Sequence, residues 1–93
     1  MILALNCYQH CLEHLSFENA SYFETYTEKI IGKGIKLYER NIFHYLKGFS
    51  LYQKGQCKEG CKQMQEALRI FDLLGLPEQV AYYQEHYEKF VKD

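Results

Sequence analysis

Apolar side chains recur at intervals of three and four residues along most of the chain, and this spacing is the feature that most limits how it folds. Such a period places apolar residues on one face of an α-helix. In the first segment that face holds Leu5, Tyr8, Leu12 and Leu15. No segment alternates apolar and polar residues over the length of a strand. The pattern therefore predicts an all-α fold.

Turn-forming residues divide this pattern into about five helices. By residue number, the expected helices span about 3–15, 17–31, 37–54 and 57–74, with a last helix from position 77 onward. Ser16 suits the N-cap of the second helix, and Gly32, Gly55 and Gly75 suit helix ends. Pro77 is tolerated at the first position of the last helix. Since short turns force neighbouring helices to run antiparallel, we expect antiparallel helical hairpins.

The length and composition fit one folded domain over residues 1–93. Of the 93 residues, 47% are hydrophobic and 25% are charged, which is typical of a globular domain. The segment Gly32-Lys33-Gly34 is the one flexible stretch that we expect, and it is too short to link two domains. The first helix starts almost at Met1 without a capping residue, so we expect the domain to be the C-terminal fragment of a longer protein.

The charge and hydropathy patterns exclude several classes of partner. A net charge of -1 lacks the basic stripe that binds nucleic acid, so we expect no contact between this chain and nucleic acid. No apolar run is long enough to span a membrane, and no basic residue precedes a signal-like segment. We expect a cytoplasmic protein that contacts no membrane, with its four cysteines reduced.

Three small residues in the second half of the chain have the spacing of a helical repeat. Gly48, Gly60 and Ala67 are separated by twelve and seven positions, which is where tetratricopeptide repeats place small residues so that two helices approach closely. Lys47 departs from the repeat, which prefers a large apolar residue there. The spacing predicts a tetratricopeptide-like, right-handed array of helices.

The order of residues across the same region is similar to a known family. The series runs through Phe43, Leu46-Lys47-Gly48, Tyr52, Gly55, Gly60, Met64, Ala67-Leu68, Phe71, Leu74-Gly75, Ala81 and Tyr83. It resembles the C-terminal region of the Rgg/GadR/MutR family of Gram-positive transcriptional regulators. The resemblance implies a regulatory domain that forms a homodimer and receives a short signalling peptide in a concave groove, with the helix-turn-helix head outside this chain. The alternative is a stand-alone adapter that binds other proteins.

Two sets of residues are candidates for these contacts. In tetratricopeptide hairpins the first helix lines the concave surface, which would present a set on the third helix to a peptide or protein. This set is Ile42, Tyr45, Phe49, Tyr52 and Gln53. The alternative for the same set is packing against the fifth helix. A dimer contact is expected on the last helix, through Val80, Tyr83, Tyr87, Phe90 and Val91.

Metal-binding and catalytic residue types are present without the arrangements that such sites need. Four possible zinc ligands share one arc of the first helix: Cys7, His10, Cys11 and His14. One straight helix rarely closes a tetrahedral site, so we expect no metal there.

The remaining cysteines and histidines also have simple interpretations. Cys57 and Cys61 lie within an apolar stripe, where core packing is expected. His44 and His86 have no nucleophile or carboxylate at a telling spacing, so surface or hydrogen-bonded structural roles are expected. We expect neither an enzyme nor a cofactor.

Overall fold

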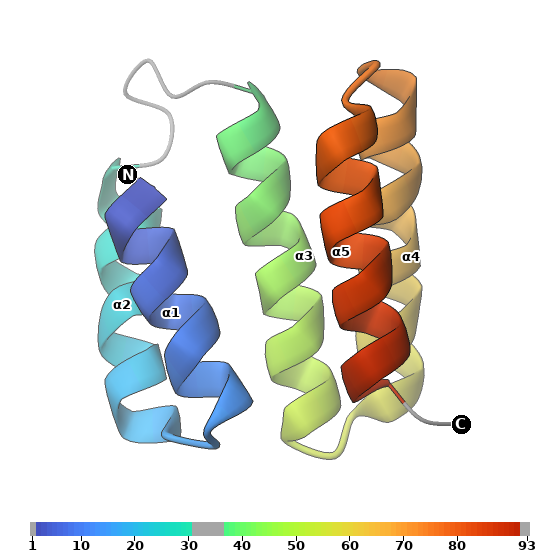
Figure 1. The fold of residues 1–93 in the computed structure, drawn as a ribbon. Coiled ribbons are helices and arrows are strands. Elements are labelled where there is room, and N and C mark those ends of the chain that lie inside the picture. Colours follow the sequence, from blue (N-terminus) through green and yellow to red (C-terminus); the bar gives the residue numbers. More distant parts are fainter. Residues whose placement is uncertain (1, 31–36, 92–93) are drawn as a thin grey trace.

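The computed structural model describes residues 2–30 and 37–91, which form five helices (Figure 1). They are α1 (Ile2–Glu13), α2 (Phe17–Ile30), α3 (Leu37–Gln53), α4 (Cys57–Leu73) and α5 (Pro77–Phe90). The all-α prediction is confirmed, and the described residues contain no strand. Predicted and observed helices differ by at most two residues at any end. The predicted turn around Gly32 lies outside the described residues.

The three described turns share one hydrogen-bonding pattern. In each turn, the amide of the third residue after the helix donates to a carbonyl five positions earlier: Ser16 N–H to Cys11 O, Gln56 N–H to Leu51 O and Leu76 N–H to Phe71 O. The residue before that amide has a left-handed backbone, as this type of helix end requires. Gly55 and Gly75 supply it with φ of 97° and 71°.

The first turn differs because a leucine, not a glycine, takes the left-handed position. Leu15 has a φ of 58°, which is unfavourable for a side chain with a Cβ atom. Its side chain is 58% exposed, so little burial offsets this cost. The predicted cap residue Ser16 receives a hydrogen bond at Oγ from the Asn19 side chain, at 3.0 Å. Its carbonyl accepts the N–H of Ala20 at 2.9 Å.

Helices α3 and α4 approach closely because two glycines face one another. A Cβ atom added to Gly60 would lie 2.6 Å from the carbonyl oxygen of Gly48 and 2.6 Å from the backbone nitrogen of Tyr52. The prediction that small residues bring this hairpin together is therefore confirmed. Asn41 adds a buried hydrogen bond, from Nδ2 to the carbonyl of Ala67 at 2.8 Å.

Helix α3 lies between the α1–α2 hairpin and the α4–α5 pair, and it contributes most to the core (Figure 1). Its buried apolar residues are Ile42, Phe43, Tyr45, Leu46 and Phe49. On one side Phe43 packs near Tyr8 of α1, and on the other Phe49 packs near Phe90 of α5. Helix α3 is thus covered by neighbouring helices on two sides. This position also makes α3 the floor of any groove between α1 and α5.

A candidate peptide groove between α1 and α5

A groove of about 290 Å³ separates α1 from α5. Its lining residues come from these two helices: Gln9, Glu13, Tyr82, Glu85, His86, Lys89 and Phe90. The lining combines two aromatic rings with acidic, basic and amide groups. A groove with apolar surface and a few convergent polar groups is the usual form of a ligand site.

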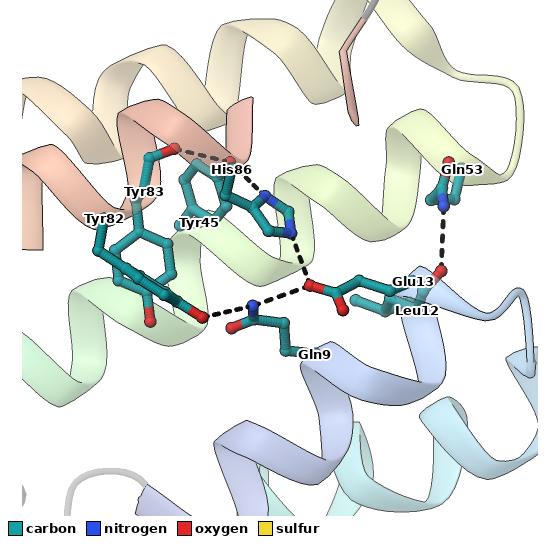
Figure 2. Close-up of polar contacts among 8 residues, drawn as sticks. All are labelled: Gln9, Leu12, Glu13, Tyr45, Gln53, Tyr82, Tyr83 and His86. Carbon is teal, nitrogen blue, oxygen red and sulfur yellow. Dashed lines mark hydrogen bonds and ion pairs between the residues drawn. The ribbon is translucent and has the colours of Figure 1, made fainter. Parts of the chain in front are cut away.

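His86 is the centre of the polar contacts in this groove (Figure 2). Its Nε2 lies 3.0 Å from Oε2 of Glu13, and its Nδ1 lies 2.9 Å from the hydroxyl of Tyr45. A carboxylate only accepts, so Nε2 carries the proton and donates to Glu13. In the neutral ring, Nδ1 then accepts from Tyr45. His86 thus connects α1, α3 and α5.

A second link crosses the groove one turn away. Nε2 of Gln9 donates to the hydroxyl of Tyr82 at 3.0 Å and to Oε2 of Glu13 at 2.9 Å (Figure 2). The other carboxylate oxygen of Glu13 and the amide oxygen of Gln9 receive no hydrogen bond from residues 2–30 and 37–91. These two acceptors remain available to a ligand that brings N–H donors, as a peptide backbone does.

Burial controls the charge state at the floor of the groove. Desolvation lowers the pKa of His86, although the nearby Glu13 carboxylate acts in the opposite direction. Desolvation also raises the pKa of Tyr45, with a further contribution from the neighbouring Tyr83. Both groups are therefore neutral at neutral pH. Both side chains therefore act as neutral hydrogen-bonding partners beneath the groove.

The residues predicted to line a concave surface on α3 occupy two different environments. Tyr45 and Phe49 are fully buried and Ile42 is 7% exposed. Tyr45 and Phe49 contact α5, as in the alternative of packing against the fifth helix. The ring of Tyr45 lies 4.9 Å from that of Tyr83, and Phe49 lies 4.7 Å from His86. Tyr52 and Gln53 are half-buried, and Gln53 donates to the carbonyl of Leu12 at 3.0 Å.

The residues predicted for dimerisation on α5 are mostly engaged within the chain. Tyr83 stacks on Phe71 at 5.3 Å and is 6% exposed, and Val91 is 7% exposed. The other three, Val80, Tyr87 and Phe90, are half-buried against the core. A dimer contact through them stays a prediction. The exposed aromatic residue on α5 is Tyr82, one position before Tyr83.

The cysteines and histidines form no metal centre in the described residues, where no group of three candidate ligands is placed to hold an ion. His10 and His14 are exposed, with ring centroids 4.3 Å apart, and Cys7 and Cys11 are half-buried. Cys61 packs against the core as expected. For Cys57 the expectation of core packing is wrong: it is the first residue of α4 and is exposed, with its thiol 3.7 Å from the carbonyl oxygen of Tyr52.

Comparison with known proteins identifies the family. A family model described as the C-terminal domain of the HTH-type transcriptional regulator Rgg matches residues 1–85. This chain belongs to the Rgg family. The match confirms the resemblance found in the sequence, and the Rgg C-terminal domain is a regulatory domain of transcription factors, not an enzyme family. A search of curated proteins gave no match. None of the described helices in this Rgg domain is long and apolar enough to cross a membrane.

Proposed function

We propose that this chain is the C-terminal, cytoplasmic part of a longer Rgg-type regulator, and that the groove between α1 and α5 receives a short peptide. The groove carries the proposal because it is the place where apolar surface, free acceptors and opposite charges meet. Glu13, Glu85 and Lys89 line it together with the exposed ring of Tyr82. In this proposal the helices form a tetratricopeptide-like array in which α1 and α5 line the groove and α3 lies beneath it.

The binding surface that we propose differs from the residues expected from sequence. Tyr45 and Phe49 support the floor from below, and the side chains that reach a ligand come from α1 and α5. Rigid tyrosine rings suit peptide recognition because they offer apolar area and a hydroxyl at a small entropic cost. Tyr82 is the ring in this position, and its hydroxyl already accepts a hydrogen bond from Gln9.

The second part of the proposal is that the full-length regulator forms a homodimer through α5. The half-buried residues Val80, Tyr87 and Phe90 would extend a contact from α5 to a second copy. Sedimentation of the full-length regulator, compared with a Val80→Glu variant, tests it. A dimer that the variant dissociates is expected, and a monomeric regulator would refute it.

The peptide groove is tested by affinity selection from the peptide fraction of the source organism's culture medium. The chain is incubated with this fraction and separated by size, and the retained peptides are identified by mass spectrometry. We expect the Tyr82→Ala variant to retain at least about ten-fold less peptide than the unmodified chain. Tyr22→Ala, at another exposed tyrosine, on α2, is the control. Equal retention by Tyr82→Ala, or no retention by the unmodified chain, would refute the groove.

A further inference from the structure

Glu13 is a half-buried carboxylate whose charge has no cationic partner in the groove between α1 and α5. Its side chain is 23% exposed. Both hydrogen bonds that it receives come from neutral donors, Nε2 of Gln9 at 2.9 Å and Nε2 of His86 at 3.0 Å. His86 is neutral because its burial lowers its pKa. The carboxylate is therefore partly removed from water with an uncompensated negative charge, which is unfavourable until a cation pairs with it.

The lysine that lines the groove does not compensate this charge. Among residues 2–30 and 37–91, neither Glu13 nor Glu85 forms an ion pair with a lysine or arginine. Nζ of Lys89 instead lies over the ring of Phe90, 5.3 Å from its centroid. Since two carboxylates and one ammonium group line the groove, its net charge is negative. The groove therefore attracts a cationic group of a ligand.

Three acceptors in the lining are free of hydrogen bonds within the described part of the chain. They are the second carboxylate oxygen of Glu13, the amide oxygen of Gln9 and the carboxylate of Glu85. Gln9 and Glu13 are joined by a hydrogen bond, so their free oxygens belong to one small site (Figure 2). The exposed Tyr82 is next to this site, since its hydroxyl lies 3.0 Å from Gln9. An ammonium group matches this set because it has three N–H donors and also binds aromatic faces.

A metal ion fits the same atoms less well. Calcium and magnesium take about six to eight oxygen ligands. In residues 2–30 and 37–91 no group of three candidate ligands is placed to hold an ion. Gln9 and His86 also direct N–H groups at Glu13, and N–H groups do not ligate a cation. The site therefore favours a cation that brings its own hydrogen-bond donors.

The size of the groove limits which part of a peptide supplies this ammonium group. Its volume of about 290 Å³ is near the lower end of the range of about 300–1,000 Å³ for ligand pockets. The groove therefore holds one end of a peptide and not its whole length. An amino terminus combines a primary ammonium group with the side chain of the first residue. The rings of Tyr82 and Phe90 offer apolar surface to that side chain.

We infer that the groove between α1 and α5 recognises the free amino terminus of its peptide, through the carboxylates of Glu13 and Glu85 and the amide oxygen of Gln9. The inference rests on the proposed function and names the end of the peptide that binds. The terminal ammonium group pairs with the carboxylate of Glu13, which has no other cationic partner among the described residues. A peptide with a blocked amino terminus loses this pairing.

Matched synthetic peptides test the inference. The peptide most enriched in the affinity selection is sequenced by mass spectrometry. It is then synthesised with a free amino terminus, with an acetylated amino terminus, and with any lysine replaced by glutamine. Titration calorimetry gives the dissociation constant of each form for the 93-residue chain. Acetylation removes a charge-assisted pairing, so we expect it to weaken binding at least about ten-fold. We expect the replacement of lysine to leave binding unchanged.

The Glu13→Gln variant locates the effect. The new amide oxygen still accepts the hydrogen bond from His86, so the contact is kept while the charge is removed. The measured quantity is the dissociation constant of the acetylated peptide divided by that of the free peptide. We expect this ratio to fall at least about three-fold in Glu13→Gln, because a neutral acceptor binds ammonium less strongly. A purely structural role of Glu13 would weaken both peptides equally. Glu66→Gln, at an exposed residue of α4, is the control.

Three results would overturn the inference. Equal binding of the free and acetylated peptides means that the amino terminus does not bind. An equal ratio in Glu13→Gln and the unmodified chain means that it binds elsewhere. A loss of binding on replacement of lysine assigns the ammonium group to a side chain. The proposed function fails in a different way, with no peptide retained by the chain or with equal retention by Tyr82→Ala, so the two failures are distinguishable.

Discussion

The hydroxyl of Tyr45 lies 2.9 Å from Nδ1 of His86, and this contact joins the central helix to the last one beneath the groove. The same hydroxyl lies 3.3 Å from the carbonyl of Tyr83. The hydroxyl has one proton, so while His86 is neutral the hydroxyl donates it to Nδ1 of His86. When His86 gains a proton, Nδ1 becomes the donor and the hydroxyl proton turns to the carbonyl. The floor of the groove therefore has two hydrogen-bonding arrangements.

Substitutions at Tyr45 separate the roles of its ring and its hydroxyl. Tyr45→Ala removes a fully buried ring and is expected to lower the free energy of unfolding by about 3–5 kcal/mol. Tyr45→Phe keeps the ring but leaves the His86 nitrogen without a donor, with an expected loss of about 1–2 kcal/mol. Urea unfolding followed by circular dichroism measures both. Tyr22→Phe, on an exposed ring, is the control, and an unchanged midpoint for Tyr45→Ala would contradict the core assignment.

The lowered pKa of His86 makes folding stability depend on pH. Below the ordinary histidine value of 6.5 the unfolded chain takes up a proton at this position more readily than the folded one. The contribution of His86 is therefore complete above pH 6.5 and is lost as the pH falls toward its folded pKa. We expect the melting temperature to drop more between pH 7.5 and 5.5 for the unmodified chain than for His86→Gln. Parallel curves for the two proteins would show that His86 is not the group responsible.

The contact between Gly48 and Gly60 predicts a graded response to added methyl groups. In Gly60→Ala the new Cβ meets backbone atoms at 2.6 Å, so the α3–α4 hairpin has to separate. Overpacking of this kind costs about 1–3 kcal/mol or more, which exceeds the helix propensity gain of about 1 kcal/mol. Gly48→Ala, with contacts at 3.0 Å, is expected to lose less. The order of the two thermal midpoints checks the prediction, and a reversed order would refute it.

The left-handed Leu15 predicts a substitution that stabilises the domain. Leu15→Gly removes a steric cost of about 1–2 kcal/mol, part of which is offset by the greater freedom of glycine in the unfolded chain. A net gain of roughly 1 kcal/mol is expected, measured by chemical unfolding. The reciprocal change Gly55→Leu, at the equivalent turn, should lose a similar amount. A less stable Leu15→Gly would mean that the leucine side chain makes contacts that outweigh its backbone cost.

The helices and two of the turns could be predicted from sequence because their causes are local. The apolar spacing, Gly55, Gly75 and Pro77 each act within a few residues of their own position. The close approach at Gly48 and Gly60 was also predictable, because only small residues at that spacing allow it. Leu15 was missed because no residue type at that position signals a left-handed backbone.

The groove could not be predicted because its parts come from opposite ends of the chain. Glu13 and His86 are separated by 73 positions, so neither has a telling neighbour in the sequence. The stripe on α3 was recognised as apolar, but periodicity does not say which neighbour covers a face. Tyr45 and Phe49 consequently support the groove instead of lining it. Cys57 was misplaced because its helix position matches an apolar stripe that begins only one turn later, at Cys61.

A titration of the isotopically labelled chain with a peptide obtained by the affinity selection tests the central claim most directly. The account predicts that nuclear magnetic resonance shifts change first at Gln9, Tyr82, Glu85 and Lys89. It also predicts that Glu85→Lys weakens binding at least about three-fold, whereas Glu66→Lys, the same charge change on α4, leaves it unchanged. Shift changes confined to α2 and α4, or equal binding by the two variants, would contradict the claim that the groove between α1 and α5 receives the peptide.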